Sequence, residues 1–315
     1  MSIPKISVVV PAYNVEKYIE AALLSLESQS FKNFEALVVD DGSIDKTPEI
    51  VESFCAKDSR FKLLRKPNGG LSSARNYGIR HARGEYIALL DGDDVYNSEK
   101  LANHFAWLIS SPQIGVVYSA SQAIRDDGTP TFMRLSGKPI KRNPLAALLC
   151  KNFIGHGSNA VFRRCIFDEI GEFDETLRSC EDVDYWLRIA ATRKWRFHRE
   201  PSVQCFYRVR PSGLSFNVQE MKSNQLRVII AACKRNPELT NHLLPTAYAY
   251  MNRYLARLCL TSGDTDSAKN YINRAWHCDH TIFLQDPRSL LTLISVRLAP
   301  LSQSVIGRTL GLVKS

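Results

Sequence analysis

Short apolar runs rich in β-branched residues alternate with amphipathic segments from residue 6 to about residue 120. The apolar runs have the length and composition of strands, at residues 6–10, 35–39, 61–64, 86–90 and 116–118. Between the first two runs, apolar residues recur at helical spacing, at Ile19, Ala22, Leu23 and Leu26. Thr47 followed by Pro48 is typical of a helix N-cap and a first helical residue. The alternation predicts a parallel sheet covered by helices on both faces.

The middle of the chain has a less regular pattern. Residues 121 to about 151 have weak periodicity and turn signals at residues 127–128 and 137–139, which indicates a connecting ribbon and loop. A helical pattern over residues 182–191 then separates two strand-like runs, at residues 158–162 and 203–209. We expect these elements to complete the first domain, which would end near residue 215.

Only helical patterns follow residue 218, at residues 221–233, 246–261, 267–276 and 288–298. Past Asp286 the sequence has no acidic residue, and the leucine-rich end of the chain carries Arg288, Arg297, Arg308 and Lys314. Basic amphipathic segments of this kind can lie on an anionic membrane surface, or the same leucines can pack against neighbouring helices, and both alternatives stay open. We expect a domain over residues 1–215 and an all-helical C-terminal region over residues 216–315.

Composition and charge narrow the class of protein. The 315 residues are 44% hydrophobic and 10% aromatic, which is enough to bury a full core. The net charge of +9 favours anionic partners, among them nucleotides and phospholipid headgroups. The eight cysteines form neither a CxxC pair nor a Cys/His cluster at zinc-ligand spacing, so we interpret them as thiols in a reducing cytosol. No apolar run reaches the ~18 residues of a membrane span, and the run at residues 6–10 is too short for a signal peptide.

Polar residues follow the first two predicted strands directly. Ligands of open α/β sheets bind at the carboxyl ends of the strands. The first strand runs into Pro11 and is followed by Tyr13, whose ring can pack on a base. The second strand runs into Asp40 and Asp41, and adjacent acids of this kind need solvent, N–H or O–H donors or a cation nearby. Both segments are therefore candidates for a nucleotide site.

Two further segments carry groups that suit a diphosphate. Residues 68–76 form a glycine-rich loop that opens a helix, so its free N–H groups and Arg75 are candidates to receive phosphate charge. The fourth strand ends in Asp-Gly-Asp-Asp at residues 91–94, and three carboxylates within four residues suit Mg²⁺ or Mn²⁺. On an extended chain, Asp91 and Asp93 lie on the same side.

These four segments, in this order and spacing, resemble the inverting family 2 glycosyltransferases of the GT-A fold. The resemblance covers residues 5 to about 215, and residues 171–175 with 180–188 resemble the family's acceptor-side segment. It implies a Rossmann-like mixed sheet flanked by helices, with Asp182 as the general base and Asp93 and Asp91 as ligands of a divalent metal, Mn²⁺ or Mg²⁺. The nucleotide-sugar-binding residues that it implies are Pro11, Tyr13, Asp40, Asp41, Arg75, Asp91 and Arg208.

The same resemblance implies the reaction. Asp182 would take the proton of an acceptor hydroxyl as its oxygen attacks the anomeric carbon, with inversion at that carbon. The metal and Arg208 or Arg75 would stabilise the departing nucleoside diphosphate. The family favours a UDP-sugar, transfer of a hexosyl or N-acetylhexosaminyl group, and a glycan or lipid-linked acceptor in bacterial cell-surface polysaccharide synthesis. The expected location is cytoplasmic, with peripheral contact to the inner face of the cell membrane as an alternative.

Other function classes fit the same residues less well. The chain has neither the G-x-G-x-x-G that a nicotinamide or flavin oxidoreductase carries after its first strand nor the motif of a P-loop kinase. Its basic residues are spread along the sequence, which disfavours nucleic-acid binding. A nucleotidyltransferase and a non-catalytic scaffold with a retained nucleotide-binding fold remain the alternatives. Singly, each motif also has a plain structural interpretation: Asp182 as an acid favoured at a helix N-terminus, and His156, between two glycines, as a structural histidine. Their joint order favours the glycosyltransferase.

Overall fold

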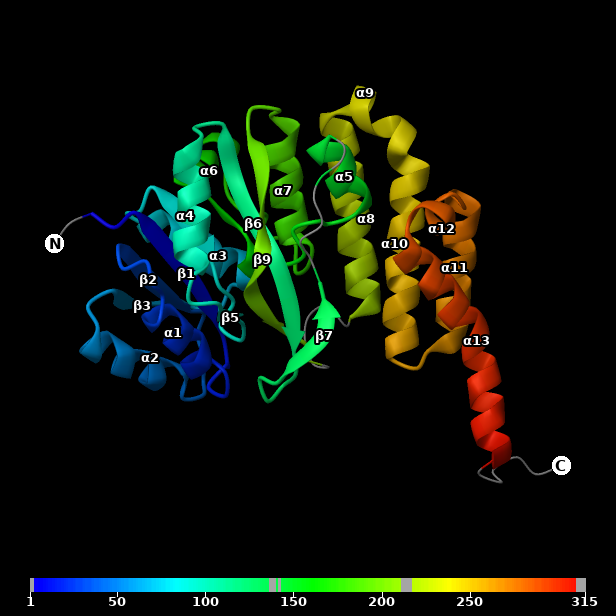
Figure 1. Ribbon diagram of the computed structural model, residues 1–315, viewed down its shortest axis with the longest axis horizontal. Coiled ribbons are helices and arrows are strands. Elements are labelled where there is room, and N and C mark those ends of the chain that lie inside the picture. Colours follow the sequence, from blue (N-terminus) through cyan, green and yellow to red (C-terminus); the bar gives the residue numbers. More distant parts are fainter. Residues whose placement is uncertain (1–2, 136–139, 141–142, 211–216, 310–315) are drawn as a thin grey trace. The chain divides into compact units, whose positions relative to one another are not determined.

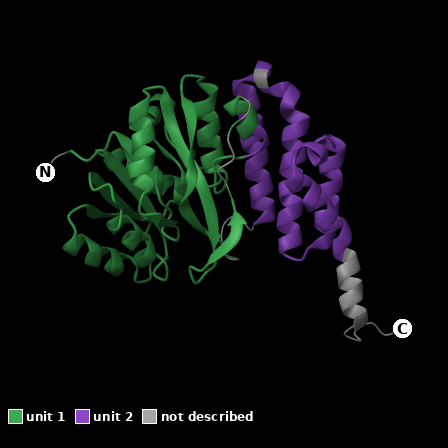
Figure 2. Ribbon diagram, in the orientation of Figure 1, with its two compact units in different colours: residues 1–148, 152–211 green, residues 149–151, 212–315 purple. Residues whose placement is uncertain are grey.

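The computed structural model describes residues 3–135, 140, 143–210 and 217–309, without the side chains of residues 239 and 300–309. The chain forms two compact units (Figure 2), one of residues 1–148 and 152–211 and the other of residues 149–151 and 212–315. The turn predicted at residues 137–139, the domain end predicted at residue 215 and the side chains of Arg308 and Lys314 lie outside the described part.

The first unit is built on one mixed sheet (Figure 1), and each of the seven predicted strand runs overlaps one of its strands. The run predicted at residues 158–162 is confirmed only at its end, because residues 157–159 form a 3₁₀ turn before β8 begins at Val161. Within the described residues, the sheet runs in the order β3-β2-β1-β4-β8-β6-β9-β5, and β7 pairs with β6. The strands are β1 (Ile6–Ala12), β2 (Phe34–Asp40), β3 (Phe61–Arg65), β4 (Tyr86–Leu89), β5 (Val95–Tyr96), β6 (Ile114–Ile124), β7 (Pro130–Arg134), β8 (Val161–Arg163) and β9 (Arg196–Arg208).

Strand direction agrees with the prediction for β1 to β4, which pair in parallel. Beyond β4 the sheet is mixed, as the family resemblance implied, because β8 inserts between β4 and β6 and is antiparallel to both. The short β5 and the β7 edge strand were not predicted. They form through antiparallel pairing with β9 and β6, which local apolar periodicity does not encode.

Helices cover the sheet on both faces, which explains why β1, β2 and β4 are buried along their whole length. The edge strand β3 is only partly buried. The helices of this unit and of the link to the next are α1 (Ile19–Glu27), α2 (Thr47–Lys57), α3 (Leu71–His81), α4 (Lys100–Ser110), α5 (Pro144–Cys150), the 3₁₀ turn η1 (Gly157–Asn159), α6 (Arg164–Ile170) and α7 (Glu181–Ala191). Val8 and Val10 belong to one core cluster with Ile19 and Leu23 of α1. On the other face α3 packs so closely that a Cβ at Gly78 would lie 2.4 Å from Val9.

The start of α2 differs from the prediction by one residue. Thr47 is the first helical residue rather than the N-cap, because its hydroxyl accepts the N–H of Val15 at 3.0 Å. The carboxylate of Asp45 accepts the N–H of Thr47 instead, also at 3.0 Å. The tertiary contact to the loop after β1 thus replaces the local cap.

The second unit is helical over its described residues, as predicted. It contains α8 (Val218–Arg235), α9 (Pro237–Thr240), η3 (Asn241–Leu243), α10 (Leu244–Thr261), α11 (Thr265–Cys278), α12 (Ile282–Gln285) and α13 (Pro287–Thr309). Helix α10 packs against α8, α11 and α13, and its Leu255 and Ala256 are fully buried. Lys151 forms an ion pair of 2.9 Å with Asp286, just before α13. None of the helices in the described residues is both long and apolar enough to cross a membrane.

Candidate functional site

The four polar segments predicted from the sequence meet at the carboxyl edge of the parallel strands. The N–H of Asp41 donates to the carbonyl of Ala12 at 2.9 Å, and the N–H of Gly92 donates to the carbonyl of Pro11 at 3.2 Å. These bonds extend the pairing of β1 with β2 and β4 beyond the strand ends into the loops. Loops from three adjacent strands are therefore held side by side.

The acid pair after β2 organises the glycine-rich loop. Asp41 is buried and accepts the N–H groups of Gly69 and Gly70, at 3.0 and 2.7 Å, and the ammonium of Lys66 at 2.5 Å. Asp40 is also buried and accepts the N–H of Ser43 at 3.0 Å. The two glycine N–H groups that the sequence offered to phosphate thus already hold a carboxylate. Lys66 was missed, although the rule that ligands bind after strand ends applies to it as well, directly after β3.

Two of the predicted nucleotide-binding residues differ sharply in access to solvent. The ring of Tyr13, just beyond β1, is 49% exposed and free to receive a flat partner such as a base. Pro11 is buried inside β1 opposite Val39, so only its backbone carbonyl, bonded to Gly92, reaches the loop.

Arg75 lies at the centre of the site rather than on its surface. Its guanidinium is 1% exposed and donates to Asp91 at 2.8 Å and to Glu181 at 2.6 Å. The two carboxylates raise the pKa of Arg75 against the opposing effect of burial. A Cβ at position 157 would lie 2.2 Å from Nη2 of Arg75, so the close approach of this loop requires Gly157. Arg75 therefore joins the turn after β4 to the start of α7.

The Asp-Gly-Asp-Asp segment is a turn, and the expectation of an extended chain is wrong. The N–H of Asp94 bonds back to the carbonyl of Asp91 at 2.9 Å. The turn separates the three carboxylates: Asp91 faces Arg75, Asp93 pairs with Arg210 at 2.7 Å, and Asp94 points into the core. The side chains of Asp91 and Asp93 remain 20% and 18% exposed. Burial raises the pKa of Asp93, and Arg210 opposes that effect.

The donor set at this turn fits a hard divalent cation. Asp91 and Asp93 present carboxylate oxygens only, with partial access to solvent, and Mg²⁺ and Mn²⁺ prefer such ligands together with water or phosphate oxygens. In this structure Arg75 neutralises the charge of Asp91, and Arg210 neutralises that of Asp93. A cation that binds here therefore competes with Arg210 for Asp93.

Asp182 stands in the first turn of α7, next to Glu181. Its carboxylate accepts the N–H of Val183 at 2.8 Å and the side-chain amide of Asn152 at 3.3 Å. Burial, together with repulsion from Glu181, raises the pKa of Asp182 to about 7, although Arg75 acts in the opposite direction. A carboxyl group with this pKa can accept a proton near neutral pH.

Arg208 holds backbone rather than pointing into open space. Its Nε donates to the carbonyl of Asp93 at 2.8 Å, and its Nη1 donates to the carbonyls of Arg125 and Asp126 at 3.0 and 2.7 Å. Arg210, two residues further on and 26% exposed at its side chain, carries the more accessible guanidinium. Arg210 is not among the residues predicted from the sequence, although its position beside Arg208 at the end of β9 was a usable signal.

The chain is similar in sequence to known glycosyltransferases. The family model described as glycosyl transferase family 2 matches residues 7–171. The glycosyltransferase EpsJ of Bacillus subtilis is 36% identical over 192 residues, 59% of this chain and 56% of the relative. A glycosyltransferase of Rickettsia typhi is 32% identical over 202 residues, 62% of each chain. The chain thus spans little more than half the length of the curated relatives it matches.

Solved structures support the fold. The mannosyltransferase PcManGT from Pyrobaculum calidifontis, in complex with GDP-Man and Mn²⁺, aligns with a TM-score of 0.60 at 21% identity, covering 96% of this chain and 88% of that one. S. aureus TarS 1–349, in complex with UDP, aligns with a TM-score of 0.52 at 20% identity, covering 90% of this chain and 92% of that one. At these identities the likeness is one of architecture.

Proposed function

The chain belongs to glycosyl transferase family 2 and has the GT-A fold, and from this premise we propose that it transfers a sugar from a nucleotide diphosphate sugar to a hydroxyl acceptor with inversion. The observation that carries the proposal is the pair of carboxylate sites joined by one buried arginine. Arg75 bonds Asp91 on the donor side and Glu181, the neighbour of Asp182, on the acceptor side. Residues 1–215 form the catalytic domain in this proposal.

Asp182 is the general base in the proposed reaction. Its pKa of about 7 lets it remain ionised in a good fraction of molecules and still hold the proton that it removes from the acceptor hydroxyl. The oxygen of the acceptor attacks the anomeric carbon as the bond to the nucleoside diphosphate breaks. Arg75 holds the start of α7 and the turn after β4 in fixed positions through its bonds to Glu181 and Asp91.

The donor site is assigned to the loops after β1, β2 and β4. Tyr13 packs on the base, Asp40 and Asp41 hold the loops that surround the nucleoside, and Pro11 fixes the backbone of the turn after β4. Asp93 and Asp91 would hold Mn²⁺ or Mg²⁺, which when bound offsets the negative charge on the departing diphosphate.

Arg208, the last residue of β9, and Arg210, just beyond the strand, are assigned different roles. We assign the contact to the diphosphate to Arg210, because its guanidinium is more accessible and already pairs with an acid of the turn. Arg208 supports the same place by holding the carbonyls of Asp93 and of residues 125–126. A UDP-sugar is the favoured donor, since related folds were solved with UDP and with UDP-GlcNAc, and GDP-Man, bound by another such fold, is the second choice.

A peripheral membrane contact through α13 would bring the enzyme to a lipid-linked glycan acceptor on the inner face of the cell membrane. One side of this helix exposes four large apolar side chains, Leu290, Leu291, Ile294 and Leu298. The opposite side buries Thr292 and Val296 in the second unit. Arg288 and Arg297 flank the exposed side, and the sequence after Asp286 has no acid to repel an anionic lipid surface. A role in cell-surface polysaccharide synthesis follows from this proposal.

The decisive experiment is release of nucleoside diphosphate from a panel of UDP- and GDP-sugars, with Mn²⁺ or with EDTA, in the presence of crude lipid and glycan acceptors. We expect metal-dependent release by the wild type and at least a hundredfold loss in Asp93→Asn and Asp182→Asn. Asp127→Asn, a change of an exposed acid in a turn of the same unit, is the matched control and should retain activity.

The alternatives give different results in the same assay. A nucleotidyltransferase would release pyrophosphate from a nucleoside triphosphate and leave the sugar nucleotides intact. A non-catalytic scaffold would bind a sugar nucleotide by calorimetry without turnover in any acceptor mixture. Absence of both release and binding would refute the proposed function.

A further inference from the structure

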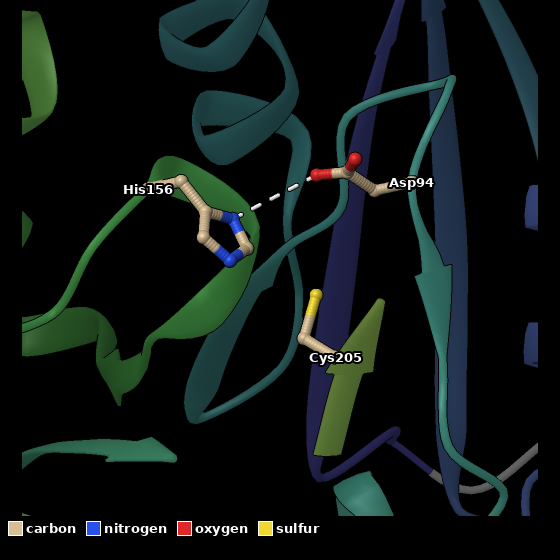
Figure 3. A group of neighbouring side chains, drawn as sticks. All are labelled: Asp94, His156 and Cys205. Atoms are coloured by element: carbon tan, nitrogen blue, oxygen red, sulfur yellow. Dashed lines mark ion pairs between the residues drawn. The ribbon is translucent and has the colours of Figure 1, made fainter. Parts of the chain in front are cut away.

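Three side chains from distant parts of the chain converge under the turn after β4 (Figure 3). Asp94 ends that turn, His156 precedes η1, and Cys205 lies in β9. A carboxylate oxygen, a ring nitrogen and the sulfur all lie within 4.8 Å of one another, and all three residues are buried. In Figure 3 the imidazole turns toward the carboxylate, with the sulfur beside both.

His156 lacks a hydrogen-bonding partner at this place. The ring is more than nine-tenths buried, and neither of its nitrogens has a partner among the described residues. Its Nδ1 lies 3.7 Å from Oδ2 of Asp94, which is too long for a hydrogen bond. Burial lowers the pKa of His156 to about 3, so the ring is neutral and this contact is no ion pair. An unpaired buried imidazole costs free energy unless a ligand binds it.

We propose that Asp94, His156 and Cys205 bind a zinc ion, at a site distinct from the oxygen ligands Asp91 and Asp93. Sulfur, nitrogen and oxygen together are ligands that zinc accepts. Mg²⁺ instead prefers an octahedral shell of oxygen ligands, which a sulfur and a nitrogen do not supply. With three side chains as ligands, a water molecule would be the fourth ligand of the zinc ion. A thiolate, a carboxylate and a neutral imidazole balance the charge of Zn²⁺, so the occupied site is neutral and suits the interior.

The distances allow the ion with small movements. Tetrahedral zinc with bonds of about 2.0–2.3 Å holds its ligand atoms about 3.3–3.8 Å apart. The distance of 3.7 Å between Nδ1 of His156 and Oδ2 of Asp94 already lies in this range. The three ligand atoms all lie within 4.8 Å of one another, so the other pairs must approach by about one ångström at most. Asp94 is oriented by the hydroxyl of Ser158 at 2.6 Å and the N–H of Arg208 at 2.9 Å, as carboxylate ligands of metals commonly are.

Binding of the ion releases a proton from the thiol. Burial, together with Asp94 and Asp91, raises the pKa of Cys205 above its usual value, so the sulfur loses its proton to solvent only as the S–Zn bond forms. The buried ammonium of Lys100, which donates to the carbonyl of Asn159 at 2.7 Å, opposes the ion. Burial lowers the pKa of Lys100 to about 8, so this amine can also lose its proton when zinc arrives. The ion would tie β9 and the loop before η1 to the turn that carries the catalytic acids.

Cobalt substitution tests the site on the full-length protein without nucleotide, with Mg²⁺ in excess to occupy Asp91 and Asp93. We expect one zinc per chain by mass spectrometry after dialysis. Replacement by Co²⁺ should give a thiolate-to-cobalt charge-transfer band in the near ultraviolet and the strong visible bands of four-coordinate cobalt. Cys205→Ser should abolish the charge-transfer band, and His156→Gln should weaken cobalt binding at least tenfold.

Two matched variants distinguish cobalt bound at this site from cobalt bound elsewhere on the protein. Cys233→Ser removes a buried thiol of the second unit, and Asp93→Asn removes a ligand of the proposed catalytic cation; both should keep the charge-transfer band. A wild type without zinc and without that band would overturn the proposal, as would a band that survives Cys205→Ser. If Cys205→Ser does not fold, unchanged cobalt affinity in His156→Gln, whose ring makes no hydrogen bond among the described residues, refutes it equally.

Discussion

Replacing Asp182 by asparagine should stabilise the protein while it removes the proposed base. Asparagine has nearly the shape of the protonated acid, but it cannot ionise. Burial and Glu181 raise the pKa of Asp182 from its ordinary 3.8 to about 7 in the folded chain, so the ionised acid opposes folding. At 1.36 kcal/mol per pKa unit, the destabilisation amounts to about 4 kcal/mol once the group is ionised in both states.

The pH window follows from the two pKa values. Below pH 3.8 the acid is protonated in both the folded and the unfolded chain, and wild type and Asp182→Asn should have nearly equal stability. As pH rises from 3.8 to 7 only the unfolded chain loses the proton, so the wild type loses about 1.4 kcal/mol of folding free energy per pH unit relative to the variant. Above pH 7 the difference should stay constant.

Urea unfolding followed by tryptophan fluorescence at pH 5, 6, 7 and 8, without metal or nucleotide, measures this difference. The gain of Asp182→Asn over wild type should roughly double between pH 5 and pH 7. Asp127→Asn is the control, because hydrogen bonds from Thr129 lower the pKa of Asp127 and its replacement gives no gain that grows with pH. A constant gain across this range, or a variant less stable than wild type at pH 8, would refute the assignment of a buried, raised-pKa acid.

Four other outcomes follow from the same structure. The rate of transfer, measured as kcat/KM, should rise with pH up to about 7 and then level off if Asp182 is the base, and a rate that falls across this range excludes it. Arg75→Met should cost about 3–5 kcal/mol in urea unfolding, because it leaves two carboxylates without their buried partner. Gly157→Ala should cost about 1–3 kcal/mol, since the new methyl group overlaps Arg75, and wild-type stability would contradict that packing. Leu291→Asp should reduce co-sedimentation with anionic vesicles but not sugar-nucleotide hydrolysis, and Ile44→Asp, at an exposed apolar residue of the first unit, is its control.

Several features of the fold were predictable because they depend on neighbouring residues alone. Within the runs at residues 6–10 and 35–39, residues 8–10 and 36–39 are continuously apolar, which indicates strands buried on both faces, and β1 and β2 confirm it. Parallel strands also present their carboxyl ends at one edge, so the polar residues after them had to meet. The helical spacing after residue 218 predicted the helices of the second unit in the same way.

Features that depend on partners far away in the chain were not predictable. The insertion of β8 between β4 and β6 and the turn at residues 91–94, expected to be extended, result from pairing and bonding across the sheet. An arginine in a helix is expected to be a solvated surface residue. Arg75 is buried instead, because Asp91, 16 residues away, and Glu181, 106 residues away, accept its hydrogen bonds.

The sequence by itself determined which segments form strands and which polar groups stand at their ends, since both follow from local periodicity and from the geometry of a parallel sheet. The tertiary structure alone decided how those groups are charged and which of them face each other. The raised pKa of Asp182 comes from burial and from Glu181. The cluster of Asp94, His156 and Cys205 has no signature at zinc-ligand spacing, because its three members come from separate loops and strands. Desolvation and long-range pairing, which act only once the chain has folded, are the physical reason.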